Sequence, residues 1–260
     1  MNAGADNQLT GAVIGAAIDV HRQLGPGLEE EGYEEALSLR LTRLGIEHET
    51  QVPRPLVYKG VRLDCGYRLD VLVERRLPLE LKAVKQLLPV HDAQLLTYMR
   101  IGKYRLGLLI NFDVELLKNG IRRKIETREL VAPDQPAPPD ADLSSRVLAA
   151  AIEIHLHTGP GLLASSYEEC LCYELASRGL KFERKKELAL RFDGSVLKTT
   201  ATIPLIVEGE IPVFPISTEQ DPTLTRATAL ARLRQGNWKV GLVLNFNSRT
   251  MAEGIQRLSV

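Results

Sequence analysis

The 260-residue chain has few aromatic residues, only three cysteines and no excess of charge of either sign. Cys65, Cys170 and Cys172 form no C-x-x-C spacing, so we expect buried core residues rather than a disulfide framework or a zinc site. Basic and acidic side chains number 33 each. This balance argues against a protein that binds nucleic acid or a membrane surface mainly through its net charge.

Long hydrophobic runs are also missing. No apolar run approaches the roughly 18 residues of a membrane-spanning helix. The first residues, MNAGADNQ, lack the basic and apolar regions of a signal peptide, so we expect a cytoplasmic protein with no membrane partner. The apolar fraction of 44% and the charged fraction of 25% are typical of a globular protein.

The chain contains an internal repeat. When His21 is aligned with His155, the rest of the first half aligns with the second half without a gap, and about 30% of the aligned residues are identical. Gly-Pro-Gly at 25–27 recurs at 159–161, and Asn-Phe at 111–112 recurs at 245–246. A proline-rich stretch at 131–142 separates the copies, which predicts two domains, 1–130 and 143–260, joined by an extended linker.

Within the first copy, apolar residues recur first at helical and then at strand spacing. Pro89 stands where a third helix would begin. The predicted elements are two amphipathic helices, three strands, a helix and a buried strand, at 9–24, 33–44, 47–63, 66–74, 77–84, 89–102 and 105–112. This order predicts an α/β domain with helices around one mixed sheet.

The apolar runs 67–73 and 77–84 carry charged residues that a buried strand would not be expected to hold, among them Asp70, Glu80 and Lys82. If residues 74–76 form a hairpin turn, Asp70 lies opposite Glu80, and Lys82 shares their face because side chains alternate along a strand. Two carboxylates this close repel unless a cation lies between them. Oxygen ligands without His or Cys favour Mg²⁺ or Mn²⁺.

An acid on one strand followed by Glu-x-Lys on the next resembles the PD-(D/E)XK nuclease superfamily. More narrowly, Gly27, Glu30 and Tyr33 resemble the bacterial family named for its GxxExxY motif. Leu69 stands at the position where the superfamily motif has proline. The resemblance implies two tandem restriction-endonuclease-like domains, each with a central mixed sheet flanked by helices.

The resemblance also implies roles for individual residues. Asp70 and Glu80 would bind the metal, helped by the Leu81 carbonyl and by Glu30, while Lys82 would position water or stabilise developing charge. Gln94 and Tyr98, four residues apart on one helical stripe, would orient the lysine or a phosphate. The remaining candidates, for contact with substrate, are His91, Arg75 and Arg76.

The second copy serves as an internal control. All seven polar residues of the candidate site are replaced there: Asp70 by Pro204, Glu80 by Phe214, Lys82 by Ile216, Gln94 by Thr228, Tyr98 by Arg232, His91 by Thr225 and Glu30 by Ala164. The fold therefore does not need these charges, which favours a chemical role in the first copy. The second copy is predicted to be a catalytically dead docking half, and the two copies to form a pseudo-symmetric pair.

These observations predict a Mg²⁺- or Mn²⁺-dependent nuclease that hydrolyses phosphodiester bonds through its first copy, with DNA as the substrate that the resemblance favours. Two alternatives stay open. The chain can be a non-catalytic interaction module of the same fold, or its site can act on RNA or on another phosphate ester.

Overall fold

The computed structural model describes residues 3–126, 141–219 and 222–260. The described residues form two compact units, one made of 3–56 and 66–126, the other of 57–65, 141–219 and 222–260. The second unit therefore includes a short segment of the first copy. Most of the predicted linker at 131–142 lies outside the described residues.

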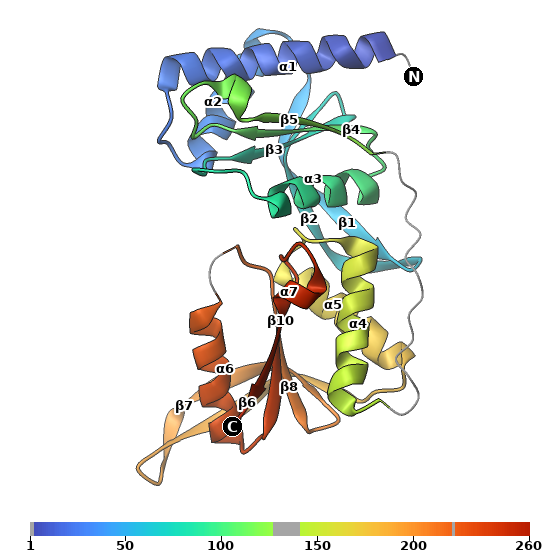
Figure 1. Ribbon diagram of the computed structural model, residues 1–260, viewed down its shortest axis with the longest axis vertical. Coiled ribbons are helices and arrows are strands. Elements are labelled where there is room, and N and C mark those ends of the chain that lie inside the picture. Colours follow the sequence, from blue (N-terminus) through green and yellow to red (C-terminus); the bar gives the residue numbers. More distant parts are fainter. Residues whose placement is uncertain (1–2, 127–140, 220–221) are drawn as a thin grey trace. The chain divides into compact units, whose positions relative to one another are not determined.

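The first copy contains three long helices, a short 3₁₀ helix and a five-stranded sheet (Figure 1). In chain order these are α1 (Ala3–Leu24), α2 (Glu30–Arg43), β1 (His48–Tyr58), β2 (Val61–Val73), β3 (Leu77–Lys82), α3 (Pro89–Ile101), β4 (Leu106–Asn111), η1 (Leu117–Asn119) and β5 (Ile121–Ile125). The strands lie in sequence order. Strand β3 is antiparallel to β2 and parallel to β4, which confirms the predicted mixed sheet.

The strands depart from the prediction most clearly at two boundaries and at one additional strand. The first strand ends at Tyr58, because Lys59 and Gly60 have φ of 47° and 81° and turn the chain. The second strand consequently begins at Val61 instead of residue 66. Strand β5 was not predicted, since Ile121–Ile125 is a partly exposed edge strand with three central basic residues and therefore no apolar run.

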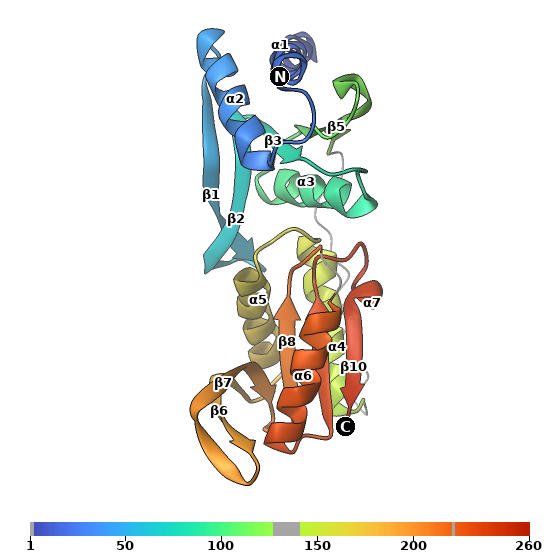
Figure 2. The same ribbon diagram turned by 90° about the vertical axis from the view of Figure 1, so that its left-hand side faces the viewer.

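Helices cover both faces of the first sheet (Figure 2). Helices α1 and α2 place Val13, Leu37 and similar residues against one face, where Leu79 and Leu81 lie in the same cluster. On the other face Leu95 and Met99 of α3 pack against Leu109 of β4. Because side chains alternate along a strand, residues 80 and 82 point to the α3 side.

The second copy repeats this arrangement. Its elements are α4 (Leu143–Thr158), α5 (Ala164–Ser177), β6 (Phe182–Phe192), β7 (Ser195–Val207), β8 (Ile211–Ile216), α6 (Thr223–Gly236), β9 (Val240–Asn245), α7 (Met251–Gly254) and β10 (Ile255–Ser259). The sheet order β10-β9-β8-β7-β6 mirrors that of the first sheet. The duplication seen in the sequence is thus a duplication of the fold.

The residues retained in both copies make the same internal contacts. The Tyr33 hydroxyl donates to the Gly25 carbonyl at 2.7 Å and its ring stacks on Phe112, as Tyr167 does with Gly159 and Phe246. These tyrosines join the loop between two helices to the core, which explains why both copies keep them.

The structure also bears on the cysteines and on the apolar length of the helices. Cys170 and Cys172 are buried core residues, as predicted, whereas the Cys65 side chain lies outside the described part. None of the helices that the structure describes has both the length and the apolar character needed to cross a bilayer.

Candidate active site

Asp70 and Glu80 face each other across strands β2 and β3. The antiparallel register pairs Val71 with Leu79, so the next pair outward is Asp70 with Glu80. The backbone N–H of Leu81 donates to Asp70 Oδ2 at 2.8 Å, which fixes the orientation of this carboxylate. The register that the hairpin turn at 74–76 predicted is confirmed.

Lys82 completes the group on the same face of β3. Its Nζ lies 2.9 Å from Glu80 Oε1, and the side chains of both residues are buried, with residue exposures of 9% and 4%. Glu80 is level with Leu109 in the parallel ladder, and Leu109 packs against α3. The lysine and the glutamate therefore lie between the sheet and α3.

Burial and like charge dominate the electrostatics of Asp70. Burial raises the pKa of Asp70 well above its usual range, and the Glu80 carboxylate raises it further, against the hydrogen bond from Leu81 and the charge of Lys82. A cation bound beside Asp70 and Glu80 would stabilise the ionised forms of both carboxylates.

The charge of Lys82 is favoured by the same acids. Burial acts to lower the pKa of Lys82, but the carboxylates of Glu80, Glu30 and Asp70 together raise it above its usual range. Lys82 is therefore cationic at neutral pH and can donate hydrogen bonds, but it cannot accept a proton.

Glu30 approaches the end of β3 from helix α2. It is the first residue of that helix, and its Oε1 accepts a hydrogen bond from the Ala83 backbone N–H at 3.2 Å. Its charge contributes to the raised pKa of both Asp70 and Lys82. The structure thus brings together four of the predicted residues, Glu30, Asp70, Glu80 and Lys82.

Helix α3 carries the other predicted residues on one buried stripe. His91 Nδ1 accepts a hydrogen bond from the Leu88 backbone N–H at 3.1 Å, so this buried ring caps the start of the helix. Gln94 and Tyr98 are buried on the face of α3 that turns to the sheet, and the Tyr98 ring stacks on Tyr67 with centroids 5.0 Å apart. Gln94 and Tyr98 therefore belong to the layer that holds Glu80 and Lys82.

Arg75 and Arg76 lie elsewhere. They occupy the turn before β3, at the opposite end of this strand from Lys82. Arg76 pairs with Asp6 at 2.7 Å and with Glu74 at 2.8 Å, whereas Arg75 is exposed near Glu47. The structure does not bring these two arginines to the carboxylates.

Two residues near the site were missed as positioning groups. Asn111 accepts from the Val84 N–H at 3.0 Å and donates to the Val84 carbonyl at 2.6 Å, and so holds the chain that leaves β3. Asp92 on α3 pairs with Arg122 at 2.5 Å and with Lys124 at 2.8 Å on β5. In the sequence, the role of Asn111 was indicated only by its recurrence as Asn245. Asn245 makes the same pair of hydrogen bonds with the backbone of Thr218.

The second copy has the same backbone at these positions without the charges. Strands β7 and β8 pair Leu205 with Val213, which places Pro204 opposite Phe214. Ile216 follows two residues later on the face of Phe214, where the first copy has Lys82. The site chemistry is therefore present in the first copy and replaced at the matching positions of the second.

The donor set at Asp70 and Glu80 suits a hard cation. Within the described ranges no group of three or more His, Cys, Asp or Glu side chains is arranged to hold a metal ion. The facing pair of carboxylates remains, and Mg²⁺ is commonly bound by one or two carboxylates while it keeps several waters and phosphate oxygens. The residues present fit Mg²⁺ or Mn²⁺ better than Zn²⁺.

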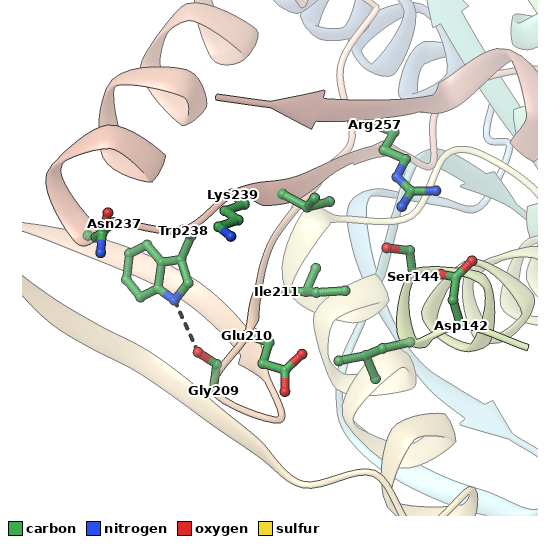
Figure 3. A pocket seen from close by; sticks show the side chains of 12 residues that line it. Asp142, Ser144, Gly209, Glu210, Ile211, Asn237, Trp238, Lys239 and Arg257 are labelled. Carbon is green, nitrogen blue, oxygen red and sulfur yellow. Dashed lines mark hydrogen bonds between the residues drawn. The ribbon is translucent and has the colours of Figure 1, made fainter.

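A cavity of about 670 Å³ lies apart from this cluster, in the second unit (Figure 3). Trp238 donates from its indole Nε1 to the Gly209 carbonyl at 3.1 Å on one side of the cavity, and Ser144 and Arg257 line another part. Asp142 and Glu210 also line the cavity.

Together the two folds and the strand-borne Asp-Glu-Lys group define a duplicated α/β protein with this group in its first copy. The sequence profile of the PD-(D/E)XK nuclease superfamily matches the chain twice, over residues 7–124 and 141–258. The chain belongs to this superfamily. Comparisons with curated proteins and with solved structures found no match.

Proposed function

We propose that the first copy is a Mg²⁺- or Mn²⁺-dependent nuclease that hydrolyses phosphodiester bonds of DNA. The observation that carries this proposal is the group formed by the half-buried Asp70 and the buried Glu80 and Lys82 on adjoining strands of a nuclease-superfamily fold. DNA is preferred as substrate on the superfamily resemblance. Within the superfamily, Gly27, Glu30 and Tyr33 favour the branch with the GxxExxY motif.

Asp70 and Glu80 would hold the metal, with the Leu81 carbonyl as a further ligand and Glu30 acting through water. When bound, the ion supplies Lewis acidity at the phosphate and lowers the pKa of an attacking water. The hydrogen bond from Leu81 to Asp70 fixes one carboxylate before any ligand arrives, so less ordering is needed on binding.

Lys82 supplies positive charge where the phosphate becomes more negative. Its three N–H donors and its raised pKa suit the stabilisation of a developing oxyanion, and Glu80 fixes the position of its Nζ. Gln94 and Tyr98 would orient this lysine or a substrate phosphate from the adjoining layer.

The second copy would act as a docking or substrate-guiding half. Pro204, Phe214 and Ile216 leave it no acid pair and no lysine at the matching positions. We propose domain limits of 1–130 and 143–260, with 131–142 as the linker.

The purified full-length protein tests the proposal on single-stranded, duplex and branched DNA and on RNA, with Mg²⁺ or Mn²⁺. We expect cleavage of DNA that EDTA abolishes and that Lys82→Ala and Asp70→Asn each reduce at least about a hundredfold, a typical loss for one transition-state donor. Lys118→Ala, at an exposed position, is the matched control and should leave the rate unchanged. Cleavage that survives both site variants would reject this site.

An interaction module is the second candidate, favoured by a second copy that keeps the fold without the acids. Calorimetry separates the two candidates. Mn²⁺ binding that Asp70→Asn abolishes, without turnover of any polymer, would favour the module, and turnover of RNA alone would change the substrate.

A further inference from the structure

The two copies end their first hairpins in the same turn. Lys59 and Gly60 between β1 and β2 have φ of 47° and 81°, and Asp193 and Gly194 between β6 and β7 have φ of 48° and 76°. Two successive residues of positive φ are typical of a type I′ turn, in which Asp-Gly is common. We call residues 57–61 the first tip and residues 191–197 the second tip.

The first tip belongs to the second unit and contacts helices α4 and α5. The Tyr58 hydroxyl donates to Glu174 Oε1 at 2.8 Å, and Lys59 forms ion pairs with Glu153 and, at 2.8 Å, with Glu174. The Tyr58 ring also lies edge-on to Tyr173, with centroids 5.7 Å apart. Glu153 and Glu174 are buried, so this pair of helices carries an acidic surface for a Tyr-Lys tip.

The second tip is exposed. Phe192, which corresponds to Tyr58, is 68% exposed, and Val196 and Leu197 beside it are 56% and 42% exposed. Three exposed apolar side chains at the end of one β-ribbon are unusual for a surface without a partner. Asp193 stands where the first tip has Lys59.

Helices α1 and α2 carry the surface that corresponds to α4 and α5, and it is open. Asp19 and Arg40 replace Glu153 and Glu174, and they pair with each other at 2.5 Å with 35% of each side chain exposed. Leu39 replaces Tyr173 and is 55% exposed. The matching surface of the second copy is buried.

The substitutions on tip and surface compensate each other. The ion pair of Lys59 with Glu174 corresponds to Asp193 with Arg40, which has the same attraction with both signs reversed. The other partner of Lys59, Glu153, corresponds to Asp19, which is itself paired with Arg40. Phe192 lacks the hydroxyl of Tyr58, and Arg40 lacks the carboxylate with which Glu174 accepts the hydrogen bond of that hydroxyl. Such paired changes are expected where two surfaces must stay complementary.

We propose that the second tip docks on α1 and α2 of a second copy of this chain. Asp193 pairs with Arg40 of that copy, and Phe192 packs on its Leu39. Within one chain, α4 and α5 already bind the first tip, and the second tip and the surface of α1 and α2 remain exposed. In a dimer, the second tip of each chain can bind α1 and α2 of the other chain, so both exposed surfaces become buried. The inference does not depend on nuclease activity.

Light scattering on the full-length protein over a concentration series tests this dimer. We expect dimers whose dissociation constant rises at least about tenfold with Asp193→Lys, Arg40→Glu or Phe192→Ser, since each removes a central contact. Arg234→Glu, on the exposed face of α6, is the charge-changing control and should have no effect. All three positions are solvent-accessible, so circular dichroism should report an unchanged fold.

A mixing experiment makes the test specific. Asp193→Lys and Arg40→Glu chains each associate poorly alone, but in a mixture every tip meets a surface of opposite charge, so heterodimers should form with near wild-type affinity. A protein that stays monomeric at all concentrations, dimers that both charge changes leave intact, or a mixture that fails to associate would each overturn the proposal.

Discussion

At the residue scale, Asp70, Glu80 and Lys82 place three charges side by side on β2 and β3, and little water reaches Glu80 and Lys82. Asp70 is held beside Glu80 although burial and like charge disfavour its ionised form. Lys82 compensates part of this cost at 2.9 Å from Glu80. Buried charges of this kind contribute little to net stability, so their presence is better explained by chemistry than by folding.

Asp70→Asn should therefore stabilise the metal-free protein while it abolishes metal binding. The amide keeps an oxygen that can accept the Leu81 N–H but removes the charge beside Glu80, so we expect a gain on the order of 1 kcal/mol in EDTA at neutral pH. Thermal unfolding followed by circular dichroism measures this change. An equal loss of stability would mean that the carboxylate is structural.

His155 makes stability depend on pH. Burial lowers the pKa of this histidine below its usual 6.5, although hydrogen bonds to backbone carbonyls act in the opposite direction. Below pH 6.5 the unfolded chain takes up a proton that the folded chain resists, so the free energy of unfolding should fall as the pH decreases toward the folded-state pKa.

Trp238 is the single tryptophan and reports unfolding of the second unit by fluorescence. Urea titrations between pH 7.5 and 5.5 should give a decreasing midpoint, and His155→Gln should flatten this dependence. A midpoint that rises toward acid pH would contradict the assigned direction.

At the scale of elements, the turn between the first two helices is held by one tyrosine in each copy. The Tyr33 hydroxyl accepts from the Leu28 N–H at 3.2 Å and donates to the Gly25 carbonyl at 2.7 Å, inside the core. Tyr167 makes the matching pair of bonds with Leu162 and Gly159.

Tyr33→Phe and Tyr167→Phe should each lower the free energy of unfolding by about 1 to 2 kcal/mol, because a partly or fully buried backbone N–H and a partly buried carbonyl lose their partner. Denaturant unfolding followed by circular dichroism measures the loss. Tyr104→Phe is the control, since its hydroxyl makes no hydrogen bond within the described residues. Effects no larger than that of the control would leave the recurrence of this tyrosine unexplained.

Local patterns predicted most elements but missed those that depend on partners. Strand β3 is entirely buried and apolar apart from Glu80 and Lys82, so its position could be read directly. Strand β5 could not be predicted in this way, because its central residues Arg122, Arg123 and Lys124 form no apolar pattern. Its pairing with β4 determines that it is a strand. The turn at Lys59 and Gly60 was also missed, although Gly60 recurs as Gly194 in an Asp-Gly pair, which is typical of such a turn.

At the scale of the molecule, one short segment of the first copy contributes to the stability of the second unit. Tyr58 is buried and donates to Glu174 on α5, so Tyr58→Phe should destabilise that unit by about 1 to 2 kcal/mol. Trp238 fluorescence in urea measures the change. Tyr104→Phe, in the first unit and with no hydrogen bond to its hydroxyl within the described residues, should leave this signal unchanged, and equal effects of both variants would contradict the assignment of the first tip to the second unit.

The sequence by itself determined the duplication, the mixed sheet and the pairing of Asp70 with Glu80, because strand alternation and turn position are local properties of the chain. It also located the loss of charge in the second copy, since the repeat supplies its own comparison. The tertiary structure alone decided that His91 caps a helix, that Arg75 and Arg76 lie away from the carboxylates, and that Lys59 meets Glu174. The cap at His91 is local, with Leu88 three residues away, but it needs the ring orientation that burial imposes. The other placements involve residues distant in sequence, and the packing of helices on the sheet, which no local pattern encodes, brings such residues together or keeps them apart.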